Sequence, residues 1–295
     1  MKTLNFGSLN IDLVYSVDHV VRPGETTASS KLEHFCGGKG LNQSIALARA
    51  GEKVYHAGCV GADGDRLLKK LSENRVDTSF VRKSDSPSGH AVIQVDKAGQ
   101  NSILLFGGAN KEITDEHIEA VMSSFSAGDR LFLQNEISGI ERIIDAAFSR
   151  GIEIVFNPSP FGGEILSFPL EKVSWFVVNE TEAQELTAQT VPEAALRVFS
   201  EKYPDANVLL TLGSEGALCR ADGRFYHQDI FRVPVVDTTA AGDTFLGFFF
   251  ALLDKLGVQE ALRYAAAASA LAVSRDGASV SIPELIEVEK FLERS

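Results

Sequence analysis

Asp237-Thr-Thr-Ala-Ala-Gly-Asp-Thr-Phe245 sets a carboxylate at the start of a helix, directly behind a turn of small residues. The apolar pattern that follows predicts this helix over residues 242–256. Small side chains at 240–242 leave the first helical amides open to an anion such as phosphate, since these amides lack acceptors inside the helix and lie at its positive end. Asp243 would repel that anion. We therefore interpret it either as a base for an incoming hydroxyl group or as an ordinary helix-capping acid.

Outward from this helix, short β-type runs alternate with amphipathic stretches along most of the chain. Strands are predicted at residues 3–9, 54–60, 130–133, 153–156, 175–178 and 208–212. Helices are predicted at residues 40–50, 64–74, 115–124, 139–150, 180–186, 192–201, 242–256, 259–274 and 283–293. Such alternation predicts an α/β fold, with a mostly parallel central sheet covered by helices on both faces.

Two stretches interrupt this alternation, because they lack helical periodicity. The second of them reads as two alternating strands around a Lys-Ala-Gly turn, which predicts a β-hairpin. We predict a single domain over residues 1–295 with a small β-sheet lid built from about 13–36 and 89–107. The apolar face of these strands is expected either to close over a ligand or to pair with a second copy in a homodimer.

Composition narrows the classes of partner and compartment. The chain has 295 residues and a net charge of −12, which argues against nucleic acid or an anionic membrane as a partner. Its three cysteines are far apart and its six histidines are scattered, so neither a disulfide framework nor a thiolate or histidine metal site is indicated. The polar N-terminus does not resemble a signal peptide, and the longest apolar run, 245–253, is too short to span a bilayer. We expect a cytoplasmic protein.

A second glycine-rich helix start occurs early in the chain, at Gly37-Gly-Lys-Gly-Leu-Asn42. Lys39 and Asn42 would face a ligand there, and the alternative interpretation is a plain turn with a solvent-exposed lysine. The spacing of the glycines matches neither a Walker A loop nor a dinucleotide-binding fingerprint. Asn10 and Asp12 follow the first predicted strand two residues apart and point the same way if the chain stays extended. An amide beside a carboxylate suits a polyhydroxylated ligand, and a turn-forming pair is the alternative.

Further polar residues follow predicted strands. Asn179-Glu-Thr-Glu182 is either a helix cap or a site where Glu182 holds Mg²⁺ through water. Thr211 and Gly213 either line a nucleotide phosphate or form a tight turn, and Glu136 follows another strand. Ligands of parallel sheets bind beyond the carboxyl ends of the strands, so these motifs are expected to converge on one edge.

Together, the segments 37–43 and 237–245 resemble the two signatures of the ribokinase family of carbohydrate kinases, the PfkB superfamily, and the resemblance covers essentially the whole chain. It implies a ribokinase-like three-layer α/β/α sandwich with a small β-sheet lid. It also implies a phosphotransferase with an alcohol acceptor, which transfers the γ-phosphate of ATP to a primary hydroxyl of a free sugar. The foremost candidate reaction is conversion of D-ribose to ribose 5-phosphate.

The resemblance also implies roles for individual residues. Asp243 is the base, and the amides of Ala241, Gly242 and Asp243, following Ala240, form the anion hole. The implied sugar contacts are Asn10, Asp12, Gly38, Lys39, Asn42, Ala91, Ile93, Glu136 and Asp243. The implied ATP contacts are Asn179, Thr211, Gly213, Ser214, Gly216 and Gly242. Glu182 is expected to hold Mg²⁺ through water, and an activating K⁺ is expected at Asp237, Thr239, Ser274, Gly277 and Ser281.

Several alternatives remain open. Leu41 stands where ribokinases have a small residue, so another pentose, a hexose, a nucleoside or a phosphosugar is a possible substrate. A phosphosugar site would add basic residues to the lid, where only Arg22, Lys31 and Lys97 occur. A non-catalytic sugar sensor would not need Asp243. A nicotinamide dehydrogenase would need Gly-x-Gly-x-x-Gly after its first strand, which the sequence lacks.

Overall fold

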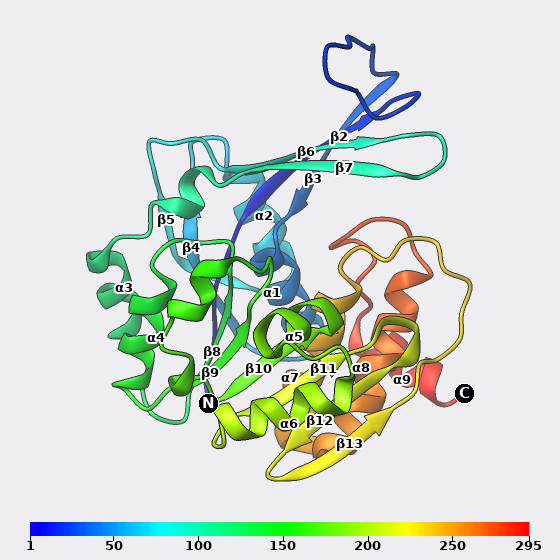
Figure 1. Cartoon of the computed structure of the whole chain (residues 1–295). Helices are drawn as coiled ribbons and strands as arrows, with labels where there is room; N and C mark the ends of the chain where they lie inside the picture. Colours follow the sequence, from blue (N-terminus) through cyan, green and yellow to red (C-terminus); the bar gives the residue numbers. More distant parts are fainter. Residues whose placement is uncertain (295) are drawn as a thin grey trace.

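The computed structural model describes residues 1–294, which form a nine-stranded sheet between two layers of helices and a separate four-stranded sheet (Figure 1). The main sheet has the strand order β13-β12-β11-β10-β9-β8-β1-β4-β5, parallel from β11 to β5 and antiparallel at β12 and β13. Its strands are β1 (Thr3–Phe6), β4 (Val54–Val60), β5 (Asp77–Lys83), β8 (Arg130–Gln134), β9 (Glu153–Asn157), β10 (Trp175–Asn179), β11 (Asn207–Thr211), β12 (Ala217–Ala221) and β13 (Arg224–Gln228). The predicted mostly parallel sheet is confirmed.

Helices cover both faces because the side chains of each central strand alternate between two apolar cores. In β10, Trp175 and Val177 face one core, while Phe176 and Val178 face the other. The first core packs against α1 (Lys39–Arg49), α2 (Asp65–Glu73), α7 (Ala241–Leu256), α8 (Val258–Val273) and α9 (Leu285–Leu292). The second packs against α3 (Asp115–Met122), α4 (Ile140–Phe148), α5 (Glu180–Thr187) and α6 (Pro192–Lys202). In the described part of the chain, no helix combines the length and apolarity that a membrane crossing requires.

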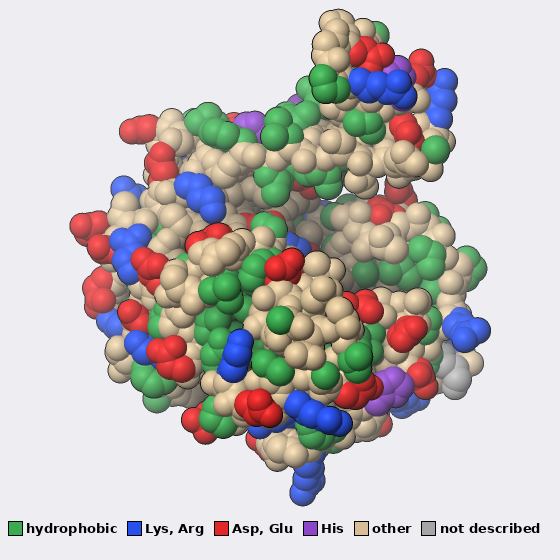
Figure 2. Space-filling model, viewed as in Figure 1, with side chains coloured by type: hydrophobic (Ala, Val, Ile, Leu, Met, Phe, Trp, Pro, Cys, Tyr) green, Lys and Arg blue, Asp and Glu red, His purple; other side chains and the backbone are tan. Residues whose placement is uncertain are grey.

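The second sheet stands apart at the top of Figure 1 and has the strand order β3-β2-β6-β7. Its strands are β2 (Asn10–Ser16), β3 (Lys31–Gly37), β6 (Gly89–Val95) and β7 (Asn101–Phe106). Its edge strand β7 is exposed along its whole length, and Leu104 is 70% exposed. Figure 2 shows that the surface is hollowed between this sheet and the main body.

The structure corrects the prediction for residues 3–9 and adds three strands. The segment predicted as one strand, 3–9, is not one strand, because β1 ends at Phe6 and the chain enters the second sheet at Asn10. The strands β5, β12 and β13 were not predicted. β5 lies at one edge of the main sheet and β13 at the other, and their mixed exposed and half-buried side chains do not give the apolar run typical of a central strand.

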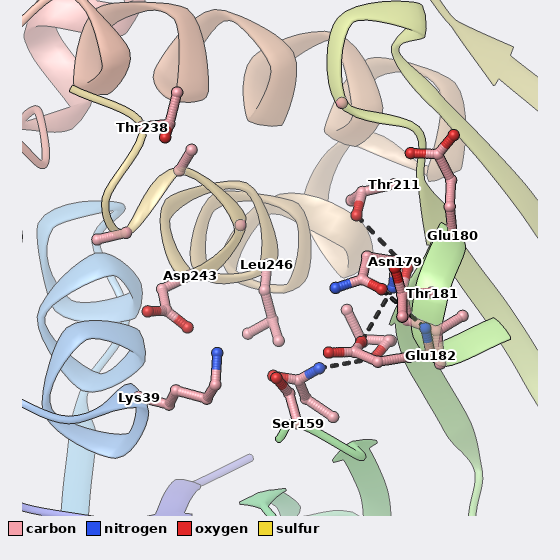
Figure 3. Close-up of a pocket in the computed structure, with 17 residues that line it drawn as sticks. Lys39, Ser159, Asn179, Glu180, Thr181, Glu182, Thr211, Thr238, Asp243 and Leu246 are labelled. Carbon is pink, nitrogen blue, oxygen red and sulfur yellow. Dashed lines mark hydrogen bonds between the residues drawn. The ribbon is translucent and has the colours of Figure 1, made fainter. Parts of the chain in front are cut away.

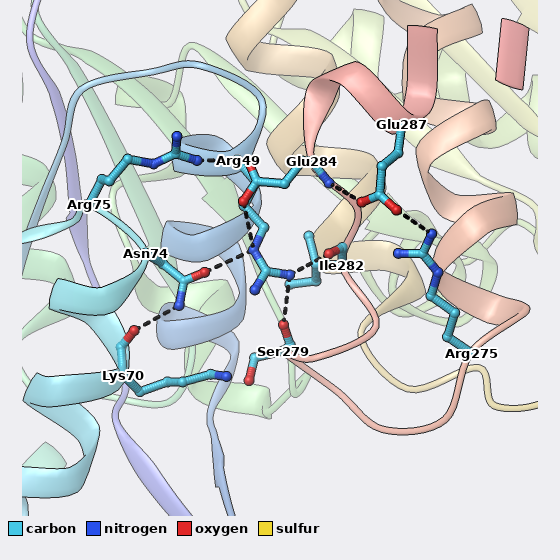
Figure 4. Close-up of polar contacts among 9 residues, drawn as sticks. All are labelled: Arg49, Lys70, Asn74, Arg75, Arg275, Ser279, Ile282, Glu284 and Glu287. Atoms are coloured by element: carbon cyan, nitrogen blue, oxygen red, sulfur yellow. Dashed lines mark hydrogen bonds and ion pairs between the residues drawn. The ribbon is translucent and has the colours of Figure 1, made fainter. Parts of the chain in front are cut away.

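The C-terminal end of α1 is anchored to a loop near the C-terminus of the chain through Arg49 (Figure 4). The guanidinium group donates to the backbone oxygens of Ser279, at 3.2 Å, and Ile282. Its Nε donates to Asn74 Oδ1 at 2.8 Å and lies 3.7 Å from a carboxylate oxygen of Glu284. These contacts hold the C-terminal end of α1, and the glycine-rich turn stands at the opposite end of the same helix.

Candidate active site

A cavity of about 480 Å³ opens at the carboxyl ends of β9, β10 and β11, beside the N-termini of α1 and α7 (Figure 3). Its lining includes Lys39, Asn179, Glu182, Thr211, Gly242 and Asp243. A larger cavity of about 860 Å³ shares Thr211, Gly213, Thr238, Ala241 and Gly242 with it. Apolar side chains from Phe231, Val235 and Ala270 line the larger cavity. The glycine-rich turn at Lys39, the segment 179–182, the turn at 211–213 and the segment 237–245 therefore meet at one edge of the sheet, and the cavity there continues into an apolar compartment.

Asp243 lies in the first turn of α7 and is only 7% exposed. Each of its carboxylate oxygens accepts a hydrogen bond from an amide group on α1. Asn42 Nδ2 donates to Oδ2 at 3.1 Å, and Gln43 Nε2 donates to Oδ1 at 2.9 Å. Asp243 is therefore more than a helix-capping acid, because two side chains from another helix hold it at the cavity wall.

Lys39 points into the same part of the cavity as Asp243 (Figure 3). Burial alone would lower its pKa, but the carboxylates of Asp243, Glu136 and Glu182 outweigh this effect and raise the pKa above its usual value. The ammonium group therefore stays charged, and the site holds a fixed positive charge next to a buried carboxylate.

The turn before α7 has the geometry of an anion-binding turn. Ala240 adopts the left-handed conformation, with φ of 60°, which costs a non-glycine residue about 1–2 kcal/mol. The backbone oxygen of Ala240 accepts from Thr244 N at 2.8 Å, and Ala241 N donates to Thr238 O at 3.2 Å. The amide of Ala241 is thus already engaged, whereas Gly242 and Asp243 lie in the first turn, where amides have no acceptor inside the helix. Strain at a helix start beside a cavity is typical of a functional turn.

Asp12 lies near the start of β2, on a face of the second sheet that otherwise carries apolar side chains. Asp12 pairs in register with Ala91 on β6 and with Phe35 on β3, and Ile93 follows on the same face. Burial, and secondarily the Glu136 carboxylate, raise the pKa of Asp12 from 3.8 to about 7. A Cβ atom at Gly37 would collide with the Asp12 carboxylate, which explains the glycine at that position.

The other predicted sugar contacts are held by hydrogen bonds around this surface. Asn10 Oδ1 accepts from Asn110 Nδ2 at 2.7 Å. Glu136 accepts from the backbone N–H of Lys39 at 3.0 Å and from the hydroxyl group of Ser8. Gly38 caps α1 with φ of 95°. Of the predicted sugar contacts, Lys39 and Asp243 line the cavity, and Asn42 is bonded to Asp243.

Asn179 and Glu182 form a complete capping box at the start of α5. Asn179 Oδ1 accepts from Glu182 N at 2.8 Å, and Glu182 Oε2 accepts from Asn179 N at 3.0 Å. The capping interpretation therefore holds, yet Glu182 is also only 5% exposed and lines the cavity. The described residues contain no cluster of three or more His, Cys, Asp or Glu able to hold a metal ion. A divalent ion here would need phosphate and water as most of its ligands.

The predicted cation loop is only partly assembled by direct contacts. Asp237 Oδ1 accepts from Thr239 N at 2.8 Å and Thr239 Oγ1 at 2.6 Å, while Oδ2 accepts from Gly277 N at 3.0 Å. Partial burial would raise the pKa of Asp237, but these hydrogen bonds outweigh it and lower the pKa. Ser274 and Ser281 each donate to a backbone oxygen three residues earlier, at 2.8 Å. Asp237, Thr239 and Gly277 thus form one hydrogen-bonded unit, and the two serine hydroxyl groups bond within their own turns.

Sequence reasoning missed several polar residues of the site. Gln43 follows Asn42 inside the glycine-rich motif, so its position was a usable signal. Asn110, Asn157 and Ser159 carry no recognisable motif: Asn110 holds Asn10, and the other two line the cavity. Their roles depend on contacts between segments that are distant in the sequence.

A family model described as pfkB family carbohydrate kinase matches residues 2–285. The chain belongs to this family. The Haemophilus influenzae ribokinase, a pfkB family relative, is 37% identical over 100% of this chain and 99% of its own length. The ribokinase structure from Thermotoga maritima has a TM-score of 0.89 at 35% identity and covers 99% of each chain. The Arabidopsis thaliana ribokinase complexed with ribose and ATP has a TM-score of 0.85 at 29% identity, covering 100% of this chain and 99% of its own.

These matches confirm the family resemblance, the ribokinase-like fold and the class of enzyme, a phosphotransferase with an alcohol acceptor. The roles of individual residues, the monovalent cation and the homodimer are not tested by them, and they stay predictions.

Proposed function

We propose that this pfkB family kinase transfers the γ-phosphate of ATP to the 5-hydroxyl group of D-ribose, giving ribose 5-phosphate and ADP. The observation that carries the proposal is the buried Asp243, which Asn42 and Gln43 hold at the cavity wall in the first turn of α7. Relatives that are ribokinases along their full length support it, as does the ribokinase structure that holds ribose and ATP.

In this proposal ATP lies across the two joined cavities. The adenosine occupies the larger, apolar cavity, and the phosphates pass Thr211 and Gly213, which line both cavities, toward the amide of Gly242. The helix N-terminus and the charged Lys39 stabilise negative charge on the transferred group. Ser214 and Gly216 line only the larger cavity and contact the nucleoside end.

Ribose lies between this phosphate site and the second sheet. Asn10, Asp12 and Glu136 accept from its hydroxyl groups, and Ala91 and Ile93 cover its apolar face. The buried Asn42 Oδ1 has no hydrogen-bond partner among the described residues, so it is available to a sugar hydroxyl group. Asp243 then takes the proton of the 5-hydroxyl group as its oxygen attacks phosphorus, with positioning and electrostatics supplying most of the rate enhancement.

Glu182 is the residue that fits Mg²⁺, because its buried carboxylate faces the cavity and only one of its oxygens is used by the capping box. Bound with the phosphates, Mg²⁺ would neutralise charge on the nucleotide. We expect the enzyme to work in the cytoplasm, where its free cysteines, Cys36, Cys59 and Cys219, stay reduced.

A monovalent cation is expected to activate the enzyme. The carboxylate of Asp237 and the oxygens of Thr239, Ser274 and Ser281 offer ligands suited to K⁺, and Gly277 supplies the left-handed turn that brings the loop to Asp237. Because Asp237 precedes the anion-binding turn, K⁺ should raise turnover several-fold over Na⁺ by ordering that turn. Rates with ATP and ribose in buffers of only one cation measure this, and equal rates would reject the cation site.

The second sheet is proposed as a lid over the sugar that also pairs with a second copy of the chain. Ile103, Leu104, Leu105 and Phe106 are each at least 50% exposed along β7, and a bare apolar edge strand favours association. Sedimentation velocity at micromolar concentration should give a dimer for the wild type and a monomer for Leu104→Lys. Leu166→Lys, at a residue 60% exposed elsewhere, should stay dimeric. A monomeric wild type would contradict the pairing.

The rival substrates make different demands on the same lid. A phosphosugar needs free cations, but Lys31 lies 2.8 Å from Glu33 and Lys97 lies 2.7 Å from Asp18, so both are paired at the surface. A panel of D-ribose, 2-deoxyribose, other pentoses, hexoses, nucleosides and phosphosugars, assayed by ADP release, tests the proposal. Ribose should have the highest kcat/KM. A higher value for any other acceptor would reassign the substrate, and no activity with any acceptor would favour a sugar sensor.

A further inference from the structure

We propose that Gln43 is a positioning residue, which fixes the orientation of the Asp243 carboxylate through a buried row of amide side chains running from the first strand of the main sheet. The proposal rests on the proposed function, in which Asp243 is the base. It concerns a residue outside the predicted sugar, nucleotide and metal contacts. Gln43 is 1% exposed and lies on α1, and it reaches Asp243, which is 200 residues away in the sequence.

Gln43 uses all of its polar atoms inside the protein. Its Nε2 donates to Asp243 Oδ1 at 2.9 Å and to Asn157 Oδ1 at 3.3 Å. Its Oε1 accepts from Gln134 Nε2 at 2.7 Å. Gln134, which is fully buried at the end of β8, also donates to Asn5 Oδ1 at 3.1 Å.

The direction of every amide in this row is dictated by backbone carbonyl groups, which can only accept. Asn5 must present its nitrogen to Gly40 O, at 3.0 Å, so its oxygen faces Gln134. Gln134 must therefore present its nitrogen both to Asn5 and to Gln43. This leaves the oxygen of Gln43 facing Gln134 and its nitrogen facing Asp243.

A second anchor gives the same orientation independently. Asn157 Nδ2 donates to Val177 O at 2.8 Å, so the oxygen of Asn157 must face Gln43, which again requires the nitrogen of Gln43 on that side. This orientation costs folding free energy, because Gln134 Oε1 is buried without a hydrogen-bond partner in the described part of the chain. If the amide of Gln134 alone were reversed, its oxygen would face the oxygens of Asn5 and Gln43. The observed orientation is therefore the less costly of the two.

This row has a direct consequence for the base. Gln43 and Asn42 occupy one side of each Asp243 oxygen, so only the lone pairs facing the cavity remain for a substrate hydroxyl group. A hydrogen bond donated to a carboxylate also favours its charged form, which is the form able to accept a proton. Gln43 thus acts on the reaction through Asp243 and without touching the substrate.

Gln43→Met tests this role, because it removes the donor while keeping the length of the side chain. Loss of a hydrogen bond to a charged group predicts a kcat about 10- to 10²-fold lower, with the KM values for ribose and ATP within a few-fold. A contact that only supported the fold would lower stability without this selective loss of kcat.

Ser44→Ala is the matched control. Ser44 is the next residue of α1, is fully buried, and makes a buried hydrogen bond to His56 Nδ1 at 2.8 Å without contacting Asp243. It should lower stability while leaving kcat and KM unchanged. A kcat of Gln43→Met that equals the kcat of Ser44→Ala and of the wild type would overturn the proposal, provided that Asp243→Asn is inactive. An active Asp243→Asn would instead reject the base assignment.

A measurement that needs no activity separates this proposal from the proposed substrate. In urea unfolding, the destabilisation caused by Gln43→Met should be smaller in an Asp243→Asn background than in the wild type, because the hydrogen bond to a charged acceptor is already lost there, whereas that of Ser44→Ala should be the same in both backgrounds. Equal destabilisation by Gln43→Met in both backgrounds would contradict the positioning role even if no sugar proved to be a substrate.

Discussion

Asp243→Asn is expected to lower kcat by about 10²–10⁴-fold, the range associated with losing a general base, while KM for ATP and ribose changes little. The physical reason is that an amide cannot take the proton of the 5-hydroxyl group, although it has nearly the shape of the carboxylate. Steady-state rates of ADP release at saturating ribose measure the change. A kcat within about 10-fold of the wild type would reject the assignment of Asp243 as the base.

Asp254→Asn is the control for this variant, since it makes the same substitution near the far end of α7. Its side chain is 52% exposed and lies 3.3 Å from the guanidinium of Arg130. Arg130 keeps Glu153 as a partner, and Asp254 lies outside the cavity lining, so the turnover of Asp254→Asn should match the wild type. Thermal unfolding of both variants checks that any loss of rate does not reflect unfolding.

Asp12→Asn is expected to have opposite effects on sugar binding and on stability. Losing hydrogen bonds to a charged acceptor should lower kcat/KM for ribose by about 10- to 10²-fold. The ligand-free protein should nevertheless become more stable near pH 8, because a half-buried carboxylate that has no hydrogen-bond donor among the described residues is removed. Increased stability with reduced affinity would indicate a residue kept for binding.

The pH dependence of both effects follows from the raised pKa of Asp12. Because its pKa is about 7 in the folded protein and 3.8 ordinarily, the folded state holds the proton more tightly, and the contribution of Asp12 to stability falls as pH rises from about 4 to 7. The difference in unfolding free energy between Asp12→Asn and the wild type should therefore increase across that window. KM for ribose should rise as pH falls below 7, where Asp12 becomes protonated. A difference that is constant from pH 4 to pH 8 would contradict the assigned pKa.

Asp18→Asn provides the comparison, as Asp18 lies just beyond the same strand but is 74% exposed and paired with Lys97. Asp18→Asn should not reduce the affinity for ribose as Asp12→Asn does, and it should not make the protein more stable.

The sequence predicted the central strands and their helices because both have strong local patterns. Five of the six predicted strands match observed strands to within one residue at each end, since buried apolar runs such as β10 are bounded by polar residues. The edge strand β5 has no such run, because one side of it is open to solvent. The break within 3–9 was missed because Gly7, Ser8 and Leu9 are as buried as the strand that precedes them.

The site was predictable where chemistry follows a motif, and not where it depends on distant contacts. Asp243 and Lys39 were predicted as site residues because each stands in a glycine-containing turn at a helix start. Gln134 was not singled out in the sequence because its partner Gln43 is 91 residues away, and nothing in its own segment distinguishes it from an ordinary strand-end residue. Contacts of this kind become visible only when the strands are assembled.

The central claim is phosphoryl transfer to the 5-hydroxyl group of ribose. Its most direct test compares D-ribose with 5-deoxy-D-ribose as the acceptor for ATP, with the phosphorylated product identified by ³¹P NMR. The account predicts ribose 5-phosphate from D-ribose and no phosphorylated sugar from the 5-deoxy analogue. A phosphorylated product from 5-deoxy-D-ribose, or a product of D-ribose that carries phosphate at another position, would contradict it.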